Sequence, residues 1–165
     1  MPENQIVMVS VIFKRKIYKN LKAWKDASKG HTALLLEGAR RIGKSTLVEQ
    51  FAKKEYRSYI LIDFNEASMG VKALFDDLMD MDYIFMYLQN AYKTVLYERE
   101  SVIIFDEVQQ CPKARQAIKY LVKDGRFDYI ERGSLISIRK NTKDISIPSE
   151  EYRVEMFPMD YEEFL

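Results

Sequence analysis

Three features of the sequence predict an α/β fold, in which a parallel sheet is covered by helices on both faces. Short apolar runs recur along the chain, and segments with helical periodicity separate them. The run SVIIFDE at 101–107 is apolar on both faces, as expected of a central parallel strand. Strands that alternate with helices indicate βαβ units. The length of 165 residues is that of about one domain.

The first expected element is a basic amphipathic helix at 13–28. Its apolar positions recur at helical spacing, at Phe13, Ile17, Leu21 and Trp24. Its neighbouring cations are Lys14, Arg15, Lys16, Lys19, Lys22, Lys25 and Lys29. These cations form either the solvated face of the helix or, alternatively, a contact for the phosphate backbone of a nucleic acid at 14–29.

The remaining elements follow from apolar runs and from helix start and stop signals. Strands are expected at 33–37, 58–64, 101–107, 128–133 and 151–157. Helices are expected at 44–54, at 71–99 with a break in the DDLMDMD region, and between Pro112 and Gly125. The inward residues are expected to be Leu47, Val48, Phe51, Ala114, Ile118, Leu121 and Val122. No repeat or Pro/Gly-rich linker suggests a second domain.

Composition excludes several classes of protein. A single cysteine, Cys111, and a single histidine, His31, exclude a disulfide framework and a multi-histidine metal site. The net charge of +1 gives little general support for nucleic-acid binding. No apolar run approaches the roughly 18 residues of a membrane span, and the first basic residues follow the apolar stretch, the wrong order for a secretory signal. A cytoplasmic location with no membrane partner is therefore expected.

One segment carries a pattern that binds phosphate. Residues 38–45 fit G-x-x-x-x-G-K-[ST] and read Gly38, Ala39, Arg40, Arg41, Ile42, Gly43, Lys44 and Ser45. The two glycines let successive N–H groups point at phosphate oxygens, and the following helix presents its positive end to the same anion. Lys44 is expected to reach the β and γ phosphates, and the Ser45 hydroxyl to bind Mg²⁺. The pattern lies between a predicted strand and a predicted helix, which is the context it requires.

The run VIIFDE supplies carboxylates that suit such a site. Asp106 stands at the end of the strand, where it can hold the hydration shell of Mg²⁺. Glu107 follows directly and can orient a water molecule for attack on the γ phosphate. This pairing favours hydrolysis over transfer to a bound acceptor.

Several segments together resemble a known family. They are LLEGARRIGKSTLVEQFA, IDF, IIFDEVQQCPKARQAIKYLVKDGR, GSLIS and FPMDYEEFL. They are similar to the bacterial and archaeal AAA-type ATPases, in which a P-loop core is followed by a lid and a C-terminal domain. The resemblance implies a P-loop NTPase fold, a three-layer sandwich whose five-stranded parallel sheet has the strand after the Asp-Glu strand between that strand and the phosphate-loop strand.

The resemblance also implies roles for individual residues. It matches Lys44 and Ser45 to the phosphate-loop pair, Asp106 to the metal ligand and Glu107 to the catalytic carboxylate. The nucleotide-binding set then extends to Thr46 and to Ser134 at the end of the fourth strand. ATP and Mg²⁺ are the implied cofactors, in keeping with the absence of the Asn-Lys-x-Asp signature of GTPases.

Two departures from the family pattern bear on function. The Thr-Gly-Ser usual at the end of the fourth strand is replaced by Arg132-Gly133-Ser134. Arg132 is expected either to impair sensing of the γ phosphate or to add a charge near the phosphates, unless it faces solvent. The chain ends at YEEFL, where relatives continue, so 1–165 is expected to be a single ATPase core without lid and C-terminal domain.

Three functions remain open at this level. The chain is expected to be a Mg²⁺-dependent ATPase core that acts on an unknown partner, a nucleotide switch with little turnover, or a nucleic-acid-associated ATPase. A homo-oligomer is possible, and Arg40, Arg41 or Arg153 could approach a phosphate in the same or a neighbouring subunit. Residues 13–18 are a guess for the adenine contact.

Overall fold

The computed structural model describes the backbone of residues 3–38, 44–134 and 151–156, and the side chains of 16–38, 47–133 and 151–154. Five strands form one sheet in the order β2-β3-β4-β1-β5, and all neighbouring pairs are parallel. They are β1 (Ala33–Gly38), β2 (Ser58–Asp63), β3 (Ser101–Asp106), β4 (Asp128–Ser134) and β5 (Glu151–Met156). Because β4 lies between β3 and β1, the expected α/β fold and strand order are confirmed.

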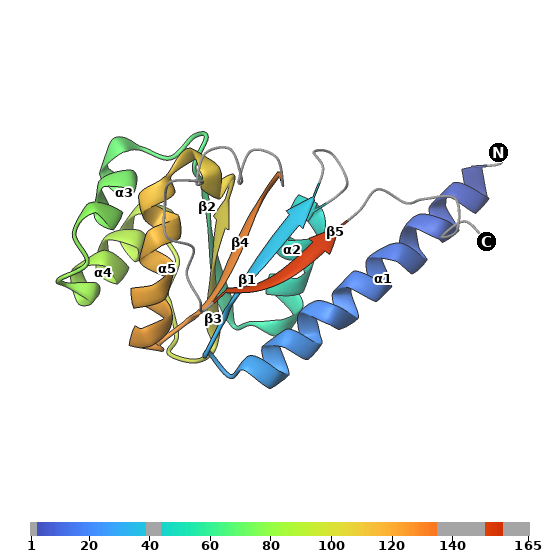
Figure 1. Ribbon diagram of the computed structural model, residues 1–165, viewed down its shortest axis with the longest axis horizontal. Coiled ribbons are helices and arrows are strands. Elements are labelled where there is room, and N and C mark those ends of the chain that lie inside the picture. Colours follow the sequence, from blue (N-terminus) through green and yellow to red (C-terminus); the bar gives the residue numbers. More distant parts are fainter. Residues whose placement is uncertain (1–2, 39–43, 135–150, 157–165) are drawn as a thin grey trace.

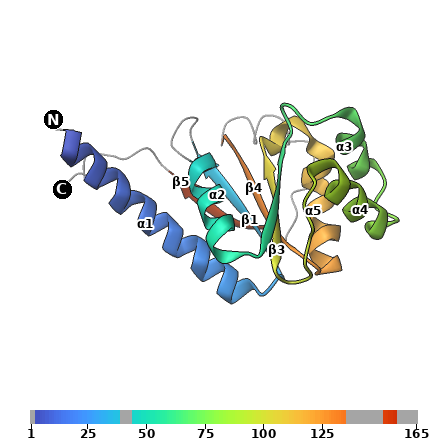
Figure 2. The same ribbon diagram turned by 180° about the vertical axis from the view of Figure 1, so that it is seen from behind.

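Helices cover both faces of this sheet (Figure 1 and, from behind, Figure 2). One face carries α1 (Glu3–Ser28) and α2 (Lys44–Glu55). The other carries α3 (Met69–Ala73), α4 (Met81–Tyr92) and α5 (Pro112–Asp124), with the short 3₁₀ helices η1 (Leu74–Asp76) and η2 (Val108–Gln110). Within the described residues, no helix combines the length and apolar character needed to cross a membrane.

The α1–α2 face has its own apolar core. Ile17, Leu21 and Trp24 of α1 are buried with Phe51 of α2 and Leu36 of β1. The lysines Lys16, Lys19, Lys22 and Lys29 are exposed. The amphipathic pattern therefore predicted the buried face and the C-terminal end of this helix correctly. The helix begins at Glu3, not near residue 13, because no glycine or proline interrupts the chain after Pro2, and its first half extends beyond the sheet (Figure 2).

The opposite face is packed mainly by aromatic rings. Phe64, Phe75 and Phe105 meet edge to face, with ring centroids 5.3–5.8 Å apart. The inward residues predicted for α5, Ala114, Ile118, Leu121 and Val122, are all buried in this core. As the sequence predicts, α5 begins at Pro112 and ends before Gly125. The φ of Gly125 is +80°, in the left-handed region that glycine adopts readily.

The helix expected over 71–99 is interrupted in the DDLMDMD region, as predicted, but its predicted extension from 93 to 99 is wrong. α4 begins after Asp80, whose side chain accepts a hydrogen bond from the Tyr83 N–H at 3.0 Å, and it ends at Tyr92. The chain then stays irregular up to β3. Polar side chains bind the backbone of this irregular segment. For example, Gln89 Oε1 accepts a hydrogen bond from the Leu96 N–H at 2.8 Å. Such tertiary hydrogen bonds override local helical propensity.

Candidate nucleotide-binding site

The carboxyl ends of β1, β3 and β4 meet at one edge of the sheet. In register, Gly38 lies beside Ser134, and Asp106 lies beside Arg132. Ligands of open parallel α/β sheets bind at this edge. The predicted loop residues 39–43 lie outside the described part of the chain, and Lys44, Ser45 and Thr46 are described only as the backbone of the first turn of α2. The backbone thus brings three predicted segments to one edge.

Arg132 and Asp106 form a bidentate ion pair. Arg132 Nε donates to Asp106 Oδ1 at 2.9 Å, and Nη2 donates to Oδ2 at 2.8 Å. The Arg132 side chain is 2% exposed and that of Asp106 is 16% exposed. The alternative in which Arg132 faces solvent is therefore wrong.

The position of Arg132 in the sheet explains why it pairs with Asp106. The register places Leu36, Arg132 and Asp106 side by side across three strands, on the face covered by α2. A guanidinium buried on such a face needs a carboxylate, because an unpaired buried charge is strongly destabilising. Asp106, in register with Arg132 on β3, supplies one.

Glu107 is held in an uncommon backbone conformation directly after β3. Its φ of 54° and ψ of 48° lie in the left-handed region. Gln109, which is 2% exposed, donates a hydrogen bond from Nε2 to Glu107 Oε2. Strained backbone at the end of a central strand is typical of functional sites. Gln109 therefore orients the carboxylate that sequence analysis predicts to act on water.

A second group of charged side chains lies on the other face of the sheet. Arg115 of α5 binds Glu151 at 3.1 Å, and both side chains are almost fully buried. Glu131 is fully buried beside them. Burial is the main cause, and the neighbouring Glu151 a further cause, that raises the pKa of the Glu131 carboxyl well above its ordinary value. Arg153 Nη1 lies 3.6 Å from Glu37 Oε1.

Two further predictions can be compared with this geometry. Arg153 is in register with Leu35, so it lies on the face opposite the Asp106–Arg132 pair. Tyr18, in the segment guessed for adenine, packs edge to face on Phe51 and donates to Glu55 at 2.6 Å. Burial and the Glu55 carboxylate raise the pKa of Tyr18 to about 12. Its hydroxyl is thus already bound to the end of α2.

The residues at the strand ends fit Mg²⁺ in chemical type. Mg²⁺ prefers oxygen ligands and usually keeps several waters, with one or two carboxylates and the phosphates completing its shell. The Asp106 carboxylate and the Ser45 hydroxyl are such ligands. Within the described residues, no group of three or more His, Cys, Asp or Glu could hold a metal ion.

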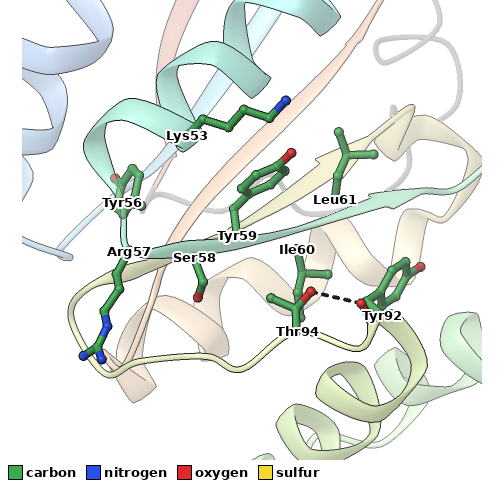
Figure 3. Close-up of a pocket in the computed structure, with 9 residues that line it drawn as sticks. All are labelled: Lys53, Tyr56, Arg57, Ser58, Tyr59, Ile60, Leu61, Tyr92 and Thr94. Carbon is green, nitrogen blue, oxygen red and sulfur yellow. Dashed lines mark hydrogen bonds between the residues drawn. The ribbon is translucent and has the colours of Figure 1, made fainter.

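A cavity of 490 Å³ lies elsewhere, along the edge strand β2 (Figure 3). It is lined by Lys53, residues 56–61, Tyr92 and Thr94. In register, Leu61 lies beside Ile104, whereas Asp106 lies beside Asp63 further along. The lining residues of β2 thus stop short of the strand ends, and none of them belongs to the predicted nucleotide site.

A family model described as an AAA domain matches residues 30–165. The chain belongs to the AAA domain family. This membership supports nucleotide binding and ATPase activity as the general class of function, and it agrees with the P-loop pattern, the strand order and the carboxylates at the end of β3. No curated protein sequence matches the chain.

Solved structures of AAA-type proteins share the fold. One chain of the Drosophila ORC structure bound to DNA is 10% identical with a TM-score of 0.57, and the match covers 96% of this chain and 98% of that one. One chain of Drosophila ORC bound to AT-rich DNA and Cdc6 is 11% identical with a TM-score of 0.58, and the match covers 98% and 61%. The present chain therefore spans less than two thirds of the latter. At these identities the likeness concerns the fold alone.

Three residues of this region were not singled out as polar partners from sequence. Arg115 falls three residues before Ile118 and seven before Val122, so helical spacing could have placed it on the buried face of α5. Glu131 lies inside a predicted central strand, where a buried acid is unusual. Gln109 has no comparable signal, because nothing in a short 3₁₀ turn predicts the direction of its side chain.

Proposed function

We propose that this chain is the core of a Mg²⁺-dependent ATPase that binds ATP at the carboxyl ends of β1, β3 and β4. The main support is the register across β4, in which Gly38, where the phosphate-binding pattern begins, lies beside Ser134, and Arg132 lies beside Asp106 at the end of β3. β4 lies between β1, which leads into the phosphate-binding pattern, and β3, which carries the proposed metal ligand. The AAA domain match supports the same class of activity.

The residues have distinct roles in this proposal. The loop at 38–45 binds the phosphates through backbone N–H groups, and Lys44 and Ser45 contact the terminal phosphates and Mg²⁺. When bound, Mg²⁺ neutralises charge on the transferred phosphoryl group. Glu107 positions the attacking water, with Gln109 fixing its carboxylate. The hydrolysis energy would drive movement of a partner or of another part of the protein.

A nucleotide switch with little turnover is the second candidate. The observation that favours it is the buried pair between Arg132 and Asp106, since it engages both oxygens of the carboxylate proposed for Mg²⁺. Binding through the phosphate loop is less dependent on that carboxylate than phosphoryl transfer is. Nucleic-acid binding by the exposed lysines of α1 remains a prediction, as do homo-oligomer formation and a phosphate contact from Arg153.

The proposed function is tested by phosphate release from ATP with and without Mg²⁺, measured for the parent and for Glu107→Gln. The variant keeps the shape of the side chain and removes its charge. We expect it to bind ATP as tightly as the parent while phosphate release falls at least a hundredfold. Glu98→Gln, an exposed position, is the matched control.

The outcomes separate the two candidates. Mg²⁺-dependent release in the parent that is lost in Glu107→Gln supports the ATPase. ATP binding without release in both proteins supports the switch. Equal release from both proteins would contradict the role of Glu107.

A further inference from the structure

We propose that Arg132 competes with Mg²⁺ for the Asp106 carboxylate and thereby sets the Mg²⁺ concentration that nucleotide binding requires. This inference rests on the proposed function, because it concerns the same site. It assigns Arg132 a role in determining the response of the site to the cation.

The geometry shows that the carboxylate is already engaged. Each Asp106 oxygen accepts one hydrogen bond from the guanidinium, at 2.9 and 2.8 Å. Fork-to-fork pairs of this kind are the strongest form of arginine–carboxylate contact. A Mg²⁺ ion or its water must share or replace these contacts to use Asp106.

The positive charges of Arg132 and Mg²⁺ make it unfavourable for both to contact the Asp106 carboxylate at once. The guanidinium neutralises the carboxylate that would attract Mg²⁺, and a divalent cation brought to the same oxygens would be repelled by Arg132. The repulsion is poorly screened because the Arg132 side chain is 2% exposed. A threonine at this position would bring no such charge.

Mg²⁺ is also hindered from displacing Arg132 from the Asp106 carboxylate, because the strand holds Arg132 in place. Its backbone is paired on both sides, with Leu36 of β1 and Asp106 of β3. Its side chain is 2% exposed and lies on the same face of the sheet as α2. Arg132 therefore stays near Asp106, and high Mg²⁺ or bound nucleotide is needed to shift the balance toward the metal.

The test measures the binding of a fluorescent, non-hydrolysable ATP analogue as Mg²⁺ is raised at constant ionic strength. Arg132→Thr and Arg132→Gln are compared with the parent, the glutamine variant being less disruptive because it fills more of the space. Arg57→Thr makes the same change of charge at an exposed position directly before β2 and serves as control.

We expect the Mg²⁺ concentration for half-maximal enhancement of binding to fall at least tenfold in both Arg132 variants. Affinity in EDTA should change less than threefold, and Arg57→Thr should behave like the parent. The same Mg²⁺ dependence in the parent and the Arg132 variants would overturn the inference.

A separate measurement applies if no protein binds the analogue, a result that would refute the proposed function. A double-mutant cycle of Arg132→Gln and Asp106→Asn in EDTA then measures the pair through the equilibrium constant of unfolding. A coupling of tenfold or more supports a pair strong enough to compete with a cation. A coupling below twofold would overturn the inference by showing that the pair does not hold Asp106.

Discussion

Replacing Glu131 by glutamine is expected to stabilise the protein increasingly as the pH rises. Glu131 is fully buried in the central strand β4, on the α5 face of the sheet. The charged groups around it are Glu151, which raises its pKa, and Arg115 and Arg153, which partly lower it. Burial has the largest effect, so the native protein keeps this carboxyl protonated above its ordinary pKa of 4.5.

The size of the effect follows from proton linkage. Above pH 4.5 the unfolded chain loses this proton while the native protein retains it, so the free energy of unfolding falls by up to about 1.4 kcal/mol per pH unit. The stabilisation by the neutral carboxyl is complete below pH 4.5 and is lost as the pH rises through the native pKa. The loss continues at this slope until the pH approaches the raised native pKa. Glutamine has no proton to lose.

Urea unfolding at pH 5, 6 and 7 measures this difference directly. The stability of Glu131→Gln minus that of the parent should increase with pH, and the exposed variant Glu98→Gln should follow the parent. Parallel stability curves for Glu131→Gln and the parent would refute the claim that Glu131 is protonated in the native protein.

Three other substitutions have defined outcomes. Gln109→Ala should lower phosphate release about tenfold, because Glu107 loses its hydrogen-bond donor, while ATP affinity measured by titration stays the same; unchanged phosphate release would contradict this role of Gln109. Gly30→Ala should lower the urea midpoint, because φ is +86° and a Cβ would lie 2.6 Å from Arg99 Nη1; an unchanged midpoint would contradict this contact. Phe105→Ala should cost about 3–5 kcal/mol in urea unfolding, since the ring is 1% exposed; a loss below about 1 kcal/mol would show that the aromatic core can collapse.

The parts of the fold that follow a strong local pattern could be predicted from sequence. Apolar periodicity places Leu21 and Trp24 inward, and the proline and glycine at the ends of α5 mark its limits. The chain beyond Tyr92 could not be predicted in this way. There, side chains distant in sequence bind the backbone, as Ser58 Oγ does to the Val95 carbonyl at 2.5 Å.

The candidate site shows the same division. The residue types at Asp106 and Glu107 point to their chemistry because they follow a buried strand after a phosphate-binding pattern. The partner of Arg132 could not be predicted, since it depends on the register of β4 against β3. From the sequence, Arg132 is expected either near the phosphates or facing solvent. In the structure its guanidinium binds the Asp106 carboxylate.

ATP binding to the parent and to Lys44→Ala is the most direct test of the central claim that the carboxyl ends of β1, β3 and β4 form a nucleotide site. Equilibrium titration in the presence of Mg²⁺ is the measurement, with Lys53→Ala, an exposed lysine near the end of the same helix, as control. We expect the parent and the control to bind ATP and Lys44→Ala to bind at least a hundredfold more weakly. Equal binding by all three, or binding by none, would contradict the account.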